Sequence, residues 1–210
     1  MRVLIVADSP QKKIKFPQIK FDYILFCDGI ANRVQNLDLI PNVIIGDMDT
    51  IHANSIEYYQ KRGVEILKIS DQNSTDLDKA LVHACKVGAK EITIVNWFGG
   101  RLDHSFHAVR TLRKHYNNAI STKLLYRKQY VEFFKDCKVK FQGPKSSMLS
   151  VLSAPKALIT SNGLAYDMTD YQLEFGLVES SCNSTVNEFG HITIKGEAII
   201  ISSIKLSLQI

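Results

Sequence analysis

The sequence has few cysteines, and their spacing fits neither a metal site nor a disulfide framework. The four cysteines, Cys27, Cys85, Cys137 and Cys182, lie far apart, and no C-x-x-C pair occurs. Structural zinc sites and disulfide-stapled folds both show closer, repeated spacing. The cysteines are therefore expected to be free thiols in a reducing compartment, the cytoplasm.

Long hydrophobic runs are also missing. The apolar stretch at residues 3–7 is too short for a signal peptide, and no other stretch reaches the length that spans a bilayer. We therefore expect a cytoplasmic protein with no membrane partner.

Neither sign of charge dominates the chain. It carries 26 Lys and Arg against 21 Asp and Glu, a net charge of +5. No basic run is interleaved with aromatic residues, which is the expected footprint of a nucleic-acid surface, so we expect no nucleic-acid partner. The basic excess lies within residues 1–128, where it would favour an anionic ligand such as nucleotide phosphates.

Short apolar runs alternate with helical stretches over residues 1–128. The runs are Val3–Ala7, Tyr23–Cys27, Val43–Ile45, Ile66–Ile69 and Ile92–Val95. Nearly continuous runs of this kind are typical of a parallel sheet that is covered on both faces. One helix is expected from Leu77, with Ser74, Thr75 and Asp76 as cap candidates. A second is expected from near Leu102, with Phe106, Val109 and Leu112 on one face.

The pattern changes beyond residue 128. Short runs alternate apolar and polar residues at 131–134, 139–141, 149–152, 158–160 and 192–195. Turns are expected at Gly143-Pro144, Asn162-Gly163 and Phe189-Gly190. Alternation with a period of two predicts an antiparallel β-sandwich. The expected organisation is thus an α/β domain over residues 1–128, with a parallel sheet, followed by a β-sandwich over residues 129–210.

Aspartates follow several of the expected parallel strands. They are Asp28 after the second run, Asp47 and Asp49 after the third, Asp76 after the fourth, and Asp103, with Arg101, after the fifth. Ligands of open parallel sheets bind outside the carboxyl ends of the strands, so we expect these side chains to face one crevice. Aspartate is also a favoured turn and cap residue, but that preference does not predict D-x-D, T-D and G-G-R-x-D motifs at consecutive strand ends.

The grouped carboxylates favour a magnesium–phosphate site. Carboxylates that lie close together repel one another, and Mg²⁺ is usually held by one or two carboxylates together with substrate phosphates. The planar fork of Arg101 suits a phosphate. The glycine patterns of P-loops and of dinucleotide-binding folds are both missing, so a site of either kind is disfavoured.

Two further features leave more than one interpretation open. His104 and His107 fall near the start of a helix, where they could have a metal or acid–base role or could simply be solvated helix residues. Tyr166 follows the turn-like stretch 162–165 and could stack on a flat ligand.

Taken together, the motifs resemble those of the thiamine pyrophosphokinase family. The matching stretches are Cys27–Asn32, Gly46–Thr50, Asp71–Leu81 and Gly99–His104, with fainter likeness at Asn162–Met168 and Ser180–Asn183. The resemblance implies an enzyme that transfers a diphosphate from ATP, its co-substrate, to the hydroxyl of thiamine, giving thiamine diphosphate and AMP. It also implies a nucleotide-binding α/β domain followed by a β-sandwich, and a homodimer with its active site at the subunit interface.

Roles for individual residues follow from the same resemblance. Asp47, Asp49 and Asp76 would be the carboxylates linked to Mg²⁺, and Arg101 would complete the catalytic group. The residues that would contact ATP are Asp28, Asn32, Gln72, Thr75, Arg101 and Asp103. Those that would line the thiamine pocket are Tyr166, Ser181 and Asn183.

Two positions depart from the family pattern. Ile30 stands where a second glycine is frequent, and Cys182 stands where a serine is frequent. Two other functions stay open at this point: a magnesium-dependent phosphotransferase acting on another small alcohol, and a non-catalytic sensor of thiamine or nucleotide. Formation of AMP from ATP and thiamine would separate these alternatives.

Overall fold

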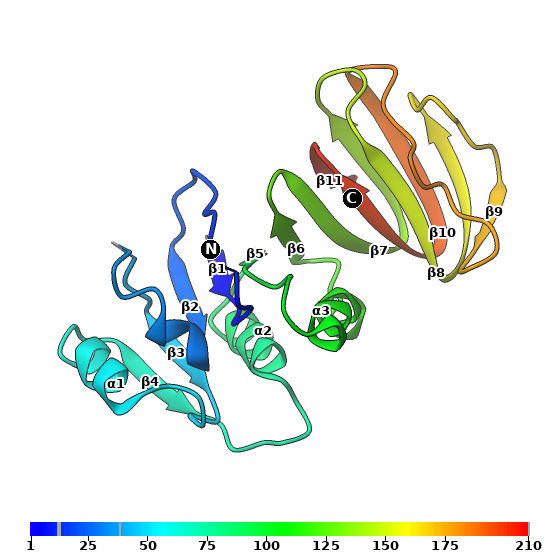
Figure 1. Cartoon of the computed structure of the whole chain (residues 1–210). Coiled ribbons are helices and arrows are strands. Elements are labelled where there is room, and N and C mark those ends of the chain that lie inside the picture. Colours follow the sequence, from blue (N-terminus) through cyan, green and yellow to red (C-terminus); the bar gives the residue numbers. More distant parts are fainter. Residues whose placement is uncertain (12–13, 38, 210) are drawn as a thin grey trace. The chain divides into compact units, whose positions relative to one another are not determined.

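The computed structural model describes residues 1–11, 14–37 and 39–209, and the chain forms two compact units (Figure 1). The first unit is Met1–Tyr126 and the second is Arg127–Ile210. The boundary expected from the change of sequence pattern, between residues 128 and 129, lies two residues further along the chain.

The first unit is built on a parallel sheet. Its strands are β1 (Arg2–Val6), β2 (Tyr23–Cys27), β3 (Val43–Gly46), β4 (Glu65–Lys68), β5 (Glu91–Val95) and β6 (Ser121–Tyr126), in the order β4-β3-β2-β1-β5-β6. Each described pairing among them is parallel. Residues 3–6 of β1 and 43–46 of β3 are all buried, as expected of strands covered on both faces. The predicted α/β class is confirmed.

Helices connect these strands. They are η1 (Asp28–Asn32), a short 3₁₀ helix, α1 (Ala53–Gln60), α2 (Asp76–Lys86) and α3 (Leu102–Lys114). Helix α2 packs against β1, β2 and β3, and its buried apolar residues are Leu77, Ala80, Leu81 and Ala84. Thr75 is its N-cap and forms a capping box with Asp78, which satisfies backbone N–H groups at the helix start.

The predicted apolar face of α3 is wrong at one position. Phe106 is 61% exposed, whereas Leu112 is buried. The other buried residues of this helix are Ser105, Ala108 and Thr111. Small side chains therefore occupy most of the buried positions of α3. The buried face of the helix is shifted by one residue from the face that the large apolar residues predict.

The second unit is antiparallel. Its strands are β7 (Gln129–Gln142), β8 (Leu149–Asn162), β9 (Tyr171–Glu174), β10 (Phe189–Ser202) and β11 (Lys205–Gln209). They pair in the order β11-β7-β10-β8-β9 around a buried cluster that includes Val139, Ile159 and Ile192. The antiparallel arrangement is confirmed, although β7 and β8 each unite two of the short strands expected from the sequence.

The turn predicted at Phe189-Gly190 is wrong, because these residues begin β10. A Cβ atom at Gly190 would lie 2.1 Å from the ring of Phe141 and 2.3 Å from the carbonyl oxygen of Asn162. Glycine is needed here for close packing between strands, and not for a change of chain direction.

No helix in the described parts of the chain is both long enough and apolar enough to cross a membrane.

Candidate functional site

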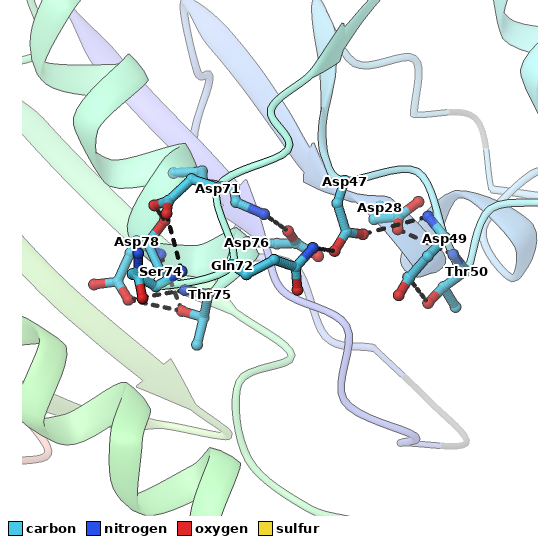
Figure 2. A network of polar contacts seen from close by, with 12 residues as sticks. Asp28, Asp47, Asp49, Thr50, Asp71, Gln72, Ser74, Thr75, Asp76 and Asp78 are labelled. Atoms are coloured by element: carbon cyan, nitrogen blue, oxygen red, sulfur yellow. Dashed lines mark hydrogen bonds and ion pairs between the residues drawn. The ribbon is translucent and has the colours of Figure 1, made fainter.

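Three aspartates bring their carboxylates together at one edge of the parallel sheet (Figure 2). Asp28 follows β2, Asp47 follows β3, and Asp76 begins α2 after β4. One carboxylate oxygen from each lies within 4.8 Å of the other two. Parallel strands end at a common edge, so residues far apart in the sequence meet there.

Asp28 is the most deeply buried of the three, with 1% of its surface exposed. Its carboxylate accepts hydrogen bonds from the backbone N–H groups of Thr50, at 3.2 Å, and Ile51, at 3.1 Å. Burial raises the pKa of Asp28, and these two hydrogen bonds offset the rise only in part. The ionised form of Asp28 is therefore unfavourable until a positively charged group approaches it.

Asp76 forms an ion pair with Lys79, a buried lysine of α2. The Nζ atom of Lys79 lies 3.0 Å from Oδ1 of Asp76, and the lysine side chain is only 4% exposed. Burial raises the pKa of Asp76, and the hydrogen bond from Lys79 counteracts this in part. Three carboxylates against one ammonium leave a surplus of negative charge. Oxygen donors with such a surplus fit Mg²⁺.

Asp47 is held in place by neutral donors. Nε2 of Gln72 lies 3.3 Å from its Oδ2, and the backbone N–H of Asp49 donates to its Oδ1 at 3.3 Å. The pKa of Asp47 is lowered: desolvation opposes the shift, but the hydrogen bonds from Asp49 and Gln72 outweigh it. The side chain of Asp49 instead accepts a hydrogen bond from Thr50 Oγ1 at 2.7 Å. A metal-ligand role for Asp49 stays a prediction, and Asp28 occupies the third place in the close group.

Gly46 allows the carboxylates to approach one another. A Cβ atom at this position would lie 2.6 Å from Cβ of Asp28 and 3.1 Å from Cγ of Asp76. The glycine before Asp47 is therefore needed for space beside the cluster.

A cleft of about 540 Å³ lies beside the cluster, within the first unit. Ligand sites typically have volumes of roughly 300–1,000 Å³. Asp76 and Thr75 line it from the start of α2, and Arg101, Asp103, His104 and His107 line it from the start of α3. Of the expected ATP contacts, Thr75, Arg101 and Asp103 thus meet in this cleft.

Arg101 and Asp103 form an exposed ion pair at the cleft. The Nε atom of Arg101 donates to Oδ1 of Asp103 at 3.1 Å, and the arginine side chain is 72% exposed. The hydrogen bond from Arg101 lowers the pKa of Asp103 to about 2. The pair fixes one edge of the guanidinium while leaving most of it open to an anion.

Asn32 supports the loop that follows β3. Its Nδ2 donates to the carbonyl of Thr50 at 2.9 Å, and its Oδ1 accepts from the N–H of His52 at 2.9 Å. Its side chain therefore shapes the cluster's surroundings, and direct contact with ATP stays a prediction.

Sequence reasoning missed Asp8 and Lys79. Asp8 lines the cleft directly after β1 and pairs with Arg33 at 2.7 Å. Its position after the first apolar run is the same signal that pointed to Asp28 and Asp47. Lys79 lies three residues beyond Asp76 on a predicted helix, a spacing that places two side chains on one face.

Asp78 is a buried carboxylate that joins α2 to α3. It is 2% exposed, and its Oδ2 accepts a hydrogen bond from the backbone N–H of Thr75. Its carboxylate oxygens also lie 2.7 Å from Nε2 of His115, 3.0 Å from Nζ of Lys114 and 3.1 Å from Nε2 of His107. Burial opposes the effect, but the hydrogen bonds from His115 and Lys114, and then those from Thr75 and His107, hold the pKa of Asp78 well below its usual range. The network fixes the start of α2, where Asp76 lies.

The expected thiamine-pocket residues lie in the second unit. Tyr166 is 73% exposed, and its backbone N–H donates to Oδ1 of Asn183 at 3.1 Å. Asn183 is 1% exposed and donates from Nδ2 to the carbonyl of Tyr166 and to Ser180 Oγ, so it fastens the loop that presents the tyrosine. Ser181 is exposed nearby in the sequence. Contact of these residues with a substrate stays a prediction.

A parallel α/β unit with a carboxylate cluster and a cleft at its strand ends has the architecture of an enzyme that handles phosphate compounds. Comparison with known proteins narrows this class. The thiamin pyrophosphokinase catalytic-domain model matches residues 18–124, which is 107 of the 210 residues. The chain belongs to the thiamin pyrophosphokinase family.

Individual relatives agree with this assignment. Thiamine pyrophosphokinase 1 of Arabidopsis thaliana is 25% identical over 211 residues, which cover 87% of this chain and 77% of the relative. Thiamine pyrophosphokinase 3 of Oryza sativa subsp. japonica is 28% identical over 216 residues, which cover 85% and 77%.

Solved structures share the fold. A thiamine pyrophosphokinase from Bacillus subtilis superposes with a TM-score of 0.83 at 20% identity, covering 96% of this chain and 98% of that one. A thiamin pyrophosphokinase from Candida albicans gives a TM-score of 0.80 at 19% identity, covering 97% and 89%. At these identities the likeness concerns the fold.

Proposed function

We propose that this protein transfers a diphosphate from ATP to the hydroxyl oxygen of thiamine, giving thiamine diphosphate and AMP. Membership of the family supports this assignment. The observation that carries it is the convergence of Asp28, Asp47 and Asp76 beside a ligand-sized cleft, inside the unit that the catalytic-domain model matches. Such a site suits a substrate with several phosphates.

Mg²⁺ is the cation we assign to the three carboxylates, with Asp49 close by. When bound, Mg²⁺ supplies positive charge that neutralises phosphate oxygens and orients them. The surplus of negative charge around Lys79 and the raised pKa values of Asp28 and Asp76 support this assignment, because a cation would relieve both.

The cleft residues would hold ATP in place for the transfer. Arg101 would donate to phosphate oxygens from the part of its guanidinium that faces away from Asp103. Gln72 would act through Asp47, which it already contacts, and Thr75 would contribute from the start of α2. Fixing the phosphates in line with the incoming hydroxyl contributes to the rate by removing translational and rotational freedom.

Thiamine would bind through the second unit of a second copy of the chain in a homodimer. Tyr166 presents an exposed ring that can stack on a flat cation. Exposed apolar side chains of the same unit, including Phe175, Leu177 and Phe189, support an interface between copies. The four free cysteines fit action in the reducing cytoplasm.

Product analysis tests the assignment directly. The purified protein is incubated with ATP and Mg²⁺, with and without thiamine, and nucleotides and thiamine esters are separated by chromatography. Equal amounts of AMP and thiamine diphosphate, formed only with thiamine present, are the expected result. Formation of ADP with thiamine monophosphate would indicate an ordinary kinase, and binding without turnover would indicate a sensor; either result would overturn the proposal.

A further inference from the structure

The basic side chains in and beside the cleft differ in how fully their charge is matched. Three of them have a carboxylate each: Lys79 with Asp76 at 3.0 Å, Arg33 with Asp8 at 2.7 Å, and Arg101 with Asp103 at 3.1 Å. These pairs are locally neutral before any ligand arrives.

The group around Asp78 is different, because three basic side chains share one carboxylate. Lys114, His107 and His115 all lie within 3.1 Å of its oxygens. Lys114 alone balances the charge of this carboxylate, so the two imidazoles are additional donors around it. An excess of donors over carboxylate oxygens favours a neighbouring anion, which can accept from the donors that Asp78 leaves free.

His107 is the member of the three that lines the cleft. Its side chain is 39% exposed, and its Nε2 lies 3.1 Å from Oδ2 of Asp78. An ionised carboxylate only accepts hydrogen bonds, so this contact places the Nε2 proton toward Asp78. The other ring nitrogen, Nδ1, has no hydrogen-bond partner among the residues that the structure describes.

The geometry points to His107 as a further nucleotide-binding residue, whose protonated ring donates from Nδ1 to a phosphate oxygen of ATP while Asp78 holds the ring through Nε2. This inference rests on the proposed function, because ATP supplies the phosphate. Oγ1 of Thr75, the N-cap of α2, lies 3.5 Å from Nε2 of the same imidazole. The positive end of the α2 helix dipole is therefore close by and also favours an anion. Asp78 would then act as a positioning residue, in the way that a carboxylate orients a ligating histidine.

A matched pair of variants tests the inference. His107→Gln and His115→Gln each remove one imidazole from Asp78, but His115 is not among the residues lining the cleft. We expect His107→Gln to raise the KM for ATP about tenfold, the loss of one hydrogen bond to a charged group, with the KM for thiamine unchanged. His115→Gln should change the KM for ATP far less than His107→Gln does, because glutamine can still donate to Asp78 and position 115 does not line the cleft. His107→Lys should recover part of the lost ATP affinity, because it restores a cation.

Equal effects of His107→Gln and His115→Gln on the KM for ATP would show that the network matters only for folding and would overturn the inference. So would a His107→Lys variant no better than His107→Gln. If His107→Gln does not fold, nitrogen-15 NMR spectra of the wild-type histidines can be recorded during titration with α,β-methylene-ATP and Mg²⁺. A shift of Nδ1 of His107, larger than any at His115, is expected, and no shift at His107 would overturn the inference.

The same experiments separate this inference from the proposed function. A wild-type protein that makes no AMP from ATP and thiamine would refute the function, while the NMR titration would still test whether His107 meets phosphate. An active wild-type protein with unaffected His107 variants would refute the inference alone.

Discussion

Replacing Asp47 by asparagine tests whether the carboxylate cluster binds a metal ion or only stabilises the fold. The carboxylates of Asp28, Asp47 and Asp76, balanced by Lys79, leave two formal negative charges. Asp47→Asn leaves one, so the charge available to a cation is halved. The asparagine has nearly the same shape, and its Oδ1 can still accept the hydrogen bond that Gln72 donates at 3.3 Å. The fold should therefore be retained, with an unchanged melting temperature in chelator.

The loss should appear in magnesium binding and in turnover. Removing one preorganised group that stabilises developing charge lowers turnover by about 100- to 1,000-fold. We therefore expect AMP formation by Asp47→Asn to fall by that factor, and the rise in melting temperature that Mg²⁺ gives the wild-type protein to shrink or vanish. Thermal unfolding with added Mg²⁺ or chelator, together with AMP release at saturating ATP and thiamine, measures both.

Asp71→Asn is the matched control. Asp71 is exposed in the loop that also contains Gln72, and its carboxylate accepts a hydrogen bond from the backbone of Asn73 at 2.9 Å. It is not part of the close group of three carboxylates. Its substitution should leave the magnesium response intact. An Asp47→Asn protein with normal turnover and a normal response to Mg²⁺ would refute the reasoning.

Three further predictions follow from particular contacts. Gly46→Ala should destabilise the fold by about 1–3 kcal/mol and abolish most activity, because its Cβ would push Asp28 and Asp76 apart; urea unfolding and AMP release measure this, and a fully active variant would contradict it. Asp78 has a lowered pKa, so the stability it contributes is present above its ordinary value of 3.8 and is lost as the pH falls below it. Asp78→Asn should therefore cost roughly 2 kcal/mol at pH 7 and flatten the loss of stability between pH 4 and pH 2, and unfolding curves with the wild-type pH dependence would count against this. Tyr166→Ala should raise the KM for thiamine, by the equivalent of about 0.5–2 kcal/mol, and leave the KM for ATP unchanged; equal effects on both constants would argue against the stacking role.

Much of the first unit could be predicted because its signals are local. Continuous runs such as 43–45 fix a buried strand, and the edge common to parallel strands then brings together whatever follows each run. That logic found Asp47 and Asp76 from the sequence. It could not decide between Asp28 and Asp49 as the third member of the group, since the choice depends on the direction of each side chain beside Gly46.

Longer-range and subtler features escaped the sequence. Asp78 meets His107 and His115 across separations of 29 and 37 residues, which no local period records. Phe106 looked like a core residue by its chemistry, yet small side chains one position away face inward instead. In the second unit the pairing of long strands, including the close approach at Gly190, depends on partners that alternation alone cannot identify.

The central claim is that aspartates from separate strand ends bind one divalent cation together with the phosphates of ATP. A crystal structure of the protein with α,β-methylene-ATP and Mn²⁺, located by its anomalous scattering, tests it most directly. The account predicts the ion within about 2.3 Å of carboxylate oxygens of Asp28, Asp47 or Asp76, close to the Mg²⁺–oxygen distance, and in contact with phosphate oxygens. An ion and nucleotide bound elsewhere, with these three carboxylates touching neither, would contradict it.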